Sequence, residues 1–310
     1  MLVAPNSRKD VMEKCACVSA IVLTYNEEDR VKDCLNSLQW CDEVWVVDSF
    51  STDKTIEVCK SVGARVVQHV FEGFSKQRQW ALEELPLAYE WVLFVDADEI
   101  VTSELATEIR KRLSDNWELM GFYVPRKEIL WDKWLRFGDC WPGCMMRLLR
   151  RGYARFPLNE VHEDAVVAGK VGRLKNPLIH YSINSISQML VRLDRYTTLE
   201  AKRLIRTRSS LFERDVPSYS RFRNVLKRLS VCVPIPLKPL AKFVWDYVIR
   251  QGFRDGRHGL AWAILNALYV YVAYFKVWEF EETSSGGSSG ADFNAVGPMP
   301  TSPEANKKRE

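Results

Sequence analysis

The alternation of short apolar runs with longer amphipathic segments between residues 18 and 125 constrains the fold of this chain more than any other feature. Runs rich in β-branched and aromatic residues predict strands, and apolar residues at helical spacing predict helices. The predicted strands are 19–24, 43–47, 64–67 and 91–95, and the predicted helices are 27–38, 54–62, 75–85 and 103–113. Because these strands are almost wholly apolar and are joined by helices, we expect an α/β fold with a mostly parallel, Rossmann-like sheet flanked by helices, which binds ligands beyond the carboxyl ends of its strands.

Polar clusters follow three of the predicted strands. Thr24-Tyr25-Asn26-Glu27 ends the first strand, Asp48-Ser49 ends the second, and Asp96-Ala97-Asp98-Glu99 ends the fourth. Side chains at these positions meet at one edge of a parallel sheet and could receive a nucleoside or a diphosphate. Helix capping by Asn26 is the alternative explanation of the first cluster, and capping by Asp53 explains part of the second.

The pair Asp96 and Asp98 predicts a metal site. Carboxylates are the oxygen ligands that Mg²⁺ and Mn²⁺ prefer, and a bound cation neutralises a departing diphosphate. We expect Asp98 to bind the metal and Asp96 to reach the metal or a ribose. His180 is a candidate third ligand, with a structural role as the alternative.

Several motifs make a resemblance specific. The segments 24–27, 48–53, 74–81 and 96–99 resemble the nucleotide-sugar half of family 2 glycosyltransferases over residues 18–125. Arg147-Leu148-Leu149-Arg150, Val161-His162-Glu163 and Leu178-Ile179-His180-Tyr181-Ser182 resemble the branch that includes lipopolysaccharide-core β-glucosyltransferases.

The resemblance implies a GT-A fold and an inverting, metal-dependent transfer of a hexose, with glucose favoured. The donor would be a nucleoside-diphosphate sugar, with a UDP-sugar favoured, and the acceptor a glycolipid, a lipid-linked glycan or a lipopolysaccharide-type glycan. Tyr25, Glu27 and Asp48 would hold the nucleoside, and Arg78 would approach the base or a phosphate. The residues implied in donor binding are Thr24, Tyr25, Asn26, Glu27, Asp48, Ser49, Lys76, Arg78, Asp96, Ala97 and Arg147.

An inverting transfer needs a base that removes the proton of the acceptor hydroxyl. The segment 159–164 offers the candidates. Glu163 is favoured because it matches the His-Glu pair of the similar branch, and Glu160 and Asp164 are its rivals. His162 would orient Glu163 or contact a phosphate. Solvated loop acids without a catalytic role are the alternative explanation of this cluster.

The second part of the chain is basic and apolar. Between Lys202 and Arg228 nine basic residues stand against two acids, and Leu260–Phe275 is apolar except for Asn266. The basic run lacks a nucleic-acid-reading motif, so we expect an anionic membrane surface as its partner and no nucleic acid. The apolar stretch is slightly short for a span, which favours an interfacial helix, with a core helix as the alternative.

These patterns predict the organisation of the chain. The expected regions are an N-terminal extension (1–17), a catalytic domain (18–185, with a nucleotide-sugar half 18–125 and an acceptor half 126–185), a basic and amphipathic helical region (186–282) and a disordered tail (283–310). Residues 1–14 hold no long apolar run, so a cytoplasmic protein on the inner face of the plasma membrane is expected. A nucleotidyltransferase acting on sugar phosphates and a non-catalytic membrane scaffold are the alternative functions.

Overall fold

A computed structural model describes residues 17–115, 118–157, 165–183, 185–208 and 235–285. These residues form two compact units, the first containing 17–126 and 144–180 and the second 127–143 and 181–285. The strands are β1 (Val18–Thr24), β2 (Glu43–Asp48), β3 (Arg65–Gln68), β4 (Trp91–Asp96), β5 (Glu99–Val101), β6 (Leu119–Leu130), β7 (Lys133–Trp134), β8 (Gly143–Arg150), β9 (Ala154–Arg155), β10 (Val166–Val167), β11 (Lys170–Arg173) and β12 (Leu178–Ile183). The helices are α1 (Val31–Asn36), α2 (Thr55–Ser61), α3 (Phe74–Glu84), α4 (Ser103–Asp115), α5 (Ile186–Arg208), η1 (Ile235–Leu237), α7 (Lys238–Val244), η2 (Trp245–Ile249), η3 (Gly252–Asp255) and α8 (Arg257–Ser285).

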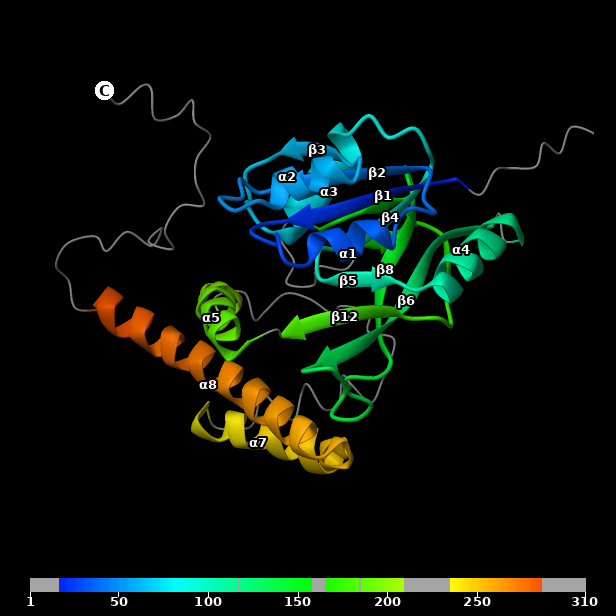
Figure 1. Ribbon diagram of the computed structural model, residues 1–310. Coiled ribbons are helices and arrows are strands. Elements are labelled where there is room, and N and C mark those ends of the chain that lie inside the picture. The colour runs from blue at the N-terminus through cyan, green and yellow to red at the C-terminus, as the bar shows by residue number, and fades with distance from the viewer. Residues whose placement is uncertain (1–16, 116–117, 158–164, 184, 209–234, 286–310) are drawn as a thin grey trace, which may run out of the picture. The chain divides into compact units, whose positions relative to one another are not determined.

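The main sheet has the strand order β3-β2-β1-β4-β8-β6-β12-β5. Its first four strands are parallel and lie side by side, as Figure 1 shows, whereas β8 joins β4 in antiparallel orientation and β12 pairs antiparallel with β5. The parallel register sets Thr24 opposite Asp48 and Leu23 opposite Asp96. The carboxyl ends of β1, β2 and β4 therefore meet at one edge, as the sequence predicts.

Alternate residues of the parallel strands fill two cores. On one face, Ala20, Val22 and Leu93 pack with helices α1 and α4, and on the other face, Ile21 and Phe94 pack with α3. Successive side chains of a strand point to opposite faces, so a strand that is apolar at every position is buried on both sides. This arrangement fixes the sheet and leaves its carboxyl edge for polar side chains.

The predicted strands and helices of residues 18–115 are confirmed, most of them to within one or two residues. Helix α1 is the exception, since it begins at Val31 rather than at position 27. The strands that follow residue 115 are absent from the predicted set: β6 is a strand of 12 residues, and β8, β11 and β12 also belong to the sheet. Pro125 and three charged residues within β6 hide the strand pattern.

The second unit is mainly helical. Helices α7 and α8 pack against each other and lie side by side in Figure 1. Gly252 and Gly259 allow a close approach, because a Cβ on Gly259 would lie 1.9 Å from the Gly252 carbonyl oxygen. Segment η3 and helix α8 therefore lie close together at these glycines. Helix α8 has 29 residues, longer than the sixteen-residue apolar stretch from which a short interfacial helix is predicted.

Candidate active site

Two loops at the carboxyl edge of the sheet hold each other in place. In the loop after β1, the backbone N–H of Asn26 donates to Ser51 Oγ (2.8 Å) and that of Glu27 to Thr55 Oγ1 (2.8 Å). In return, the Thr52 N–H of the loop after β2 donates to Asn26 Oδ1 (2.8 Å). Asn26 therefore links the two loops instead of capping α1, so the capping explanation is wrong.

Asp48 is the buried anchor of the second loop. Its carboxylate accepts hydrogen bonds from Thr24 Oγ1 (3.0 Å), from the N–H (2.9 Å) and Oγ (2.5 Å) of Ser51, and from Gln68 Nε2 (3.2 Å). Ser49 lies beside it, buried, and its Oγ accepts from Gln77 Nε2 at 3.3 Å. Asp48 thus shapes the loop after β2. The direct contact with a nucleoside that the resemblance implies for Asp48 stays a prediction.

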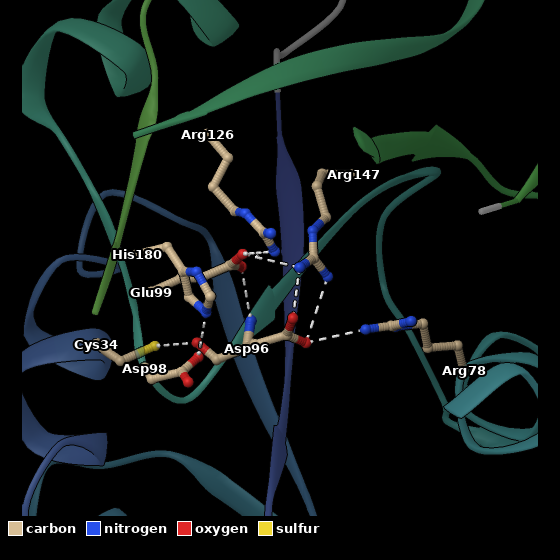
Figure 2. Close-up of polar contacts among 8 residues, drawn as sticks. All are labelled: Cys34, Arg78, Asp96, Asp98, Glu99, Arg126, Arg147 and His180. Carbon is tan, nitrogen blue, oxygen red and sulfur yellow. Dashed lines mark hydrogen bonds and ion pairs between the residues drawn. The ribbon is translucent and has the colours of Figure 1, made fainter. Parts of the chain in front are cut away.

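Two arginines hold the carboxylate of Asp96, as Figure 2 shows. Arg78 of α3 donates through Nη2 to Oδ1 at 3.0 Å. Arg147 of β8 donates to Oδ1 through Nη1 at 3.3 Å and to Oδ2 through Nη2. Burial opposes ionisation of Asp96, but the positive charges of Arg147 and Arg78 outweigh burial and hold the pKa of this carboxyl well below its usual value.

Glu99 completes this ion cluster from β5. It is fully buried, and its Oε1 accepts from Arg147 Nη2 at 2.8 Å, with Arg126 Nη1 at 3.9 Å. Its Oε2 accepts from the backbone N–H of Asp96 at 2.9 Å, which fixes the turn between β4 and β5. Burial raises the pKa of Glu99, the charge of Arg147 opposes the rise, and the charge of Asp96 adds to it.

Asp98 faces His180 on the other side of the same turn. His180 lies opposite Glu99 in the β12–β5 pairing, and its Nε2 lies 3.4 Å from Asp98 Oδ1 (Figure 2). Both side chains are mostly buried. The pairing of β12 with β5 therefore brings together Asp98 and His180, which are 82 positions apart in the sequence. This proximity is necessary if the two side chains share one site.

The donor set at this turn fits a divalent cation with open coordination positions. Asp98 supplies a carboxylate oxygen and His180 an imidazole nitrogen, and cations of the Mg²⁺ and Mn²⁺ type commonly complete their shell with substrate phosphates and water. Among the described residues, no group of three or more His, Cys, Asp or Glu side chains is arranged to hold a metal. Both oxygens of Asp96 accept hydrogen bonds from arginine, so Asp98 is the carboxylate of this pair that meets His180.

The remaining predicted residues divide into three groups. Tyr25 and Glu27 belong to the loop after β1 and Ala97 lies buried in the β4–β5 turn, at the expected edge. Lys76 is exposed on α3 and pairs with Glu72 at 3.0 Å. The predicted catalytic residues Glu160, His162, Glu163 and Asp164 lie outside the described residues, so their roles stay predictions.

The structure adds residues that are absent from the predicted set. Glu99 and Arg126 join the ion cluster, and Gln77 supports Ser49 while its Oε1 meets His69 Nδ1 at 2.8 Å. Glu99 follows directly after the Asp-x-Asp pair, a signal that the sequence did contain. Gln77 lies within the segment 74–81 that carries the resemblance, between the predicted residues Lys76 and Arg78. Arg126 carries no such signal, because only the folded sheet brings it to this edge.

Comparisons with known proteins identify the family of this chain. The sequence model of the family described as "Glycosyl transferase family 2" matches residues 19–163. A chain described as an uncharacterized glycosyltransferase of Rickettsia conorii (strain ATCC VR-613 / Malish 7) is 31% identical over 215 residues, which cover 64% of this chain and 73% of that one. This chain belongs to glycosyl transferase family 2. The predicted family is confirmed, and the protein is a glycosyltransferase with a GT-A fold.

This chain is also similar to two other proteins over most of their length. The "lipopolysaccharide core biosynthesis glycosyltransferase LpsC" of Rhizobium meliloti (strain 1021) is 28% identical over 274 residues, covering 84% of this glycosyltransferase and 92% of LpsC. The crystal structure of S. aureus TarS 1–349 is 19% identical, with a TM-score of 0.43, covering 84% of this chain and 91% of that one.

Proposed function

We propose that this glycosyltransferase moves a hexose, with glucose favoured, from a UDP-sugar to a lipid-linked or lipopolysaccharide-type glycan, with inversion at the anomeric carbon. The observation that carries the proposal is the pairing of Asp98 with His180 beside the arginine-held Asp96, at the edge where β1, β2 and β4 end. The similarity to LpsC over 84% of the chain supports the choice of acceptor class.

The site residues divide the work of binding the donor. Asp98 and His180 would hold a divalent cation, which when bound supplies positive charge to the departing nucleoside diphosphate. Asp48 and the interlocked loops after β1 and β2 would hold the nucleoside. Arg147 keeps Asp96 ionised and fixed, while Arg78 adds a second positive charge on the side of α3. The acceptor hydroxyl would lose its proton to Glu163, with Glu160 and Asp164 as rivals for this role.

We also propose that the enzyme works at the cytoplasmic face of a membrane. Among the described residues, one helix is long and apolar enough to cross a bilayer: α8, whose candidate span runs from Arg257 to Thr283. Only 17% of its most apolar window is buried, which does not fit the core helix of a soluble protein. The basic run between Lys202 and Arg228 supports contact with anionic lipid.

A donor screen tests the proposed reaction. Purified protein is incubated with a panel of nucleotide sugars and Mn²⁺ or Mg²⁺, and release of the nucleoside diphosphate is followed with and without a lipid-linked glycan. We expect Asp98→Asn to lower the turnover of the preferred donor by about 100-fold or more, because cation stabilisation of a leaving group contributes several kcal/mol. Mn²⁺ binding in the presence of UDP, measured by calorimetry, should weaken in parallel.

Asp115→Asn is the matched control. Asp115 is an exposed aspartate at the end of α4, so its substitution should change neither turnover nor Mn²⁺ binding. Unchanged metal-dependent turnover in Asp98→Asn would remove Asp98 from the site. Absence of nucleoside-diphosphate release from every UDP-sugar, with release from another nucleotide sugar, would contradict the proposed donor.

A further inference from the structure

Exposed apolar side chains gather in the second unit. Of the 20 large apolar side chains that are exposed in the described residues, 17 belong to this unit. The described part of the first unit, which contains most of the sheet, has three exposed side chains of this kind: Val70, Tyr153 and Val166. A concentration of this kind marks a surface that meets another apolar phase.

On helices α7 and η2 the exposed apolar side chains recur at a regular spacing. Leu237 ends η1, and Leu240, Val244 and Val248 follow it on α7 and η2 at spacings of three, four and four residues, which places the four on one side of this helical segment. Each is between 40% and 60% exposed. The opposite side of η2 faces α8, where buried Asp246 accepts a hydrogen bond from Asn266 Nδ2 at 2.9 Å. The segment is therefore a surface helix whose free side is apolar.

The charges around this apolar side have one sign. The basic residues between positions 235 and 260 are Lys238, Lys242, Arg250, Arg254 and Arg257, all at least partly exposed. The two acids of the same segment, Asp246 and Asp255, are buried. Asp246 pairs with Lys242, and Asp255 accepts two backbone N–H groups at 2.9 Å each. Of these basic residues, Arg250 also pairs with the exposed Asp139.

The same unit has an exposed tryptophan, Trp131. Trp131 and Asp132 form the two-residue turn between β6 and β7, with φ of 47° and 64°. Trp131 is 40% exposed, and its ring lies 6.3 Å from that of His258 at the start of α8. Tryptophan is enriched where a bilayer meets water, because its ring is apolar and its N–H is polar.

We propose that α7, η2 and η3 form an amphipathic element that lies in the plane of an anionic bilayer. The apolar residues of α7 and η2 would enter the headgroup boundary, and the exposed Arg254 and Arg257 would meet lipid phosphates. This inference rests on the proposed function and deepens it, by naming the element that would bind the enzyme to the bilayer that carries its acceptor. It also gives the exposed basic residues a partner of opposite charge.

Charge decides between the bilayer and other occupants of this surface. In a symmetric dimer the same patch would face itself, and the basic residues would then repel one another. Residues 209–234 carry five basic side chains and two acids, and residues 286–310 carry three of each. Neither segment of the chain is acidic, whereas an anionic bilayer is both apolar and negatively charged.

The test is co-sedimentation of the full chain with vesicles of phosphatidylcholine, with and without phosphatidylglycerol. We expect binding to the anionic vesicles. Leu240→Glu and Val248→Glu should each weaken it by about tenfold or more, because each removes an apolar side chain from lipid and adds a negative charge. Arg257→Gln should weaken it by roughly fivefold on anionic vesicles alone. Val166→Glu, at an equally exposed apolar position of the first unit, should bind as the wild type does.

Three outcomes would overturn the inference. One is binding to anionic vesicles that Leu240→Glu and Val248→Glu leave unchanged. Another is a wild-type protein that does not bind these vesicles at all. The third is a wild-type dimer, seen by light scattering, that these two variants dissociate, since the surface would then join two copies. Nucleoside-diphosphate release without lipid is measured on the same samples. A failure of the proposed reaction would abolish this release in the wild type, whereas a failure of the docking inference would not.

Discussion

Strands β2 and β4 both end on an aspartate at the same edge of the sheet, yet the two carboxylates are held in opposite ways. Asp48 accepts its hydrogen bonds from hydroxyl, amide and backbone groups, all of them neutral. Asp96 is held by the guanidinium groups of Arg78 and Arg147. The end of β2 therefore fixes the shape of a loop, whereas the end of β4 fixes the charge of the site.

The largest expected effect comes from breaking the ion cluster at the end of β4. Arg147→Ala leaves the buried Glu99 and the partly buried Asp96 without the guanidinium group that joins them. Removing one partner of a buried ion cluster costs about 3–5 kcal/mol. We expect a loss of that size in the free energy of unfolding, measured by urea denaturation of the full chain.

Arg150→Ala is the matched control for this variant. Arg150 lies on the same strand and pairs with the half-exposed carboxylate of Glu90 at 3.1 Å. Its loss should cost about 1 kcal/mol or less, because a partly exposed ion pair contributes little to stability. Equal costs for Arg147→Ala and Arg150→Ala would show that the buried cluster contributes no more than a surface pair.

The two strand ends also differ in how far the sequence predicts them. The apolar pattern of β1, β2 and β4 places Asp48 and Asp96 at one edge, because strand periodicity is a local property. The pairing of Asp96 with Arg147 joins residues 51 positions apart. It depends on β8 lying beside β4, and no local spacing contains that information.

The helix α1 and the strand β6 show two other reasons for differences from the prediction. Asn26 and Glu27 bond to the loop after β2, and this tertiary contact delays the start of α1 to Val31. In β6, Pro125 and the charged residues after it interrupt the alternation from which strands are predicted. Burial in the folded sheet, rather than the local pattern, makes this segment a strand.

A smaller effect is expected at the end of β2, where Asp48 accepts hydrogen bonds from neutral groups. Asp48→Asn replaces an acceptor oxygen with an amide that donates, so it meets Gln68 Nε2 or the donors of Ser51 with the wrong polarity. We expect a loss of about 1.5–3 kcal/mol in the free energy of unfolding, as for lost hydrogen bonds to a charged group. Asp33→Asn, at an exposed position of α1, should stay within about 0.5 kcal/mol of the wild type. A cost for Asp48→Asn equal to that of Asp33→Asn would mean that the loop does not depend on this anchor.

The smallest expected effect is a pH dependence of the free energy of unfolding, which arises from the ion cluster at the end of β4. Because the pKa of Asp96 is lowered in the folded protein, its contribution to stability is present above the unfolded value of about 3.9 and is lost as the pH falls below it. The buried Glu99 acts with the opposite sign, since a raised pKa gives a contribution that is lost as the pH rises. Below about pH 4 the difference in unfolding free energy between wild type and Asp96→Asn should therefore shrink, by at most about 1.4 kcal/mol per pH unit. Urea denaturation of both proteins from about pH 6 to about pH 3 measures it. A difference that stays constant over this range would mean that Arg78 and Arg147 do not favour the ionised form of Asp96.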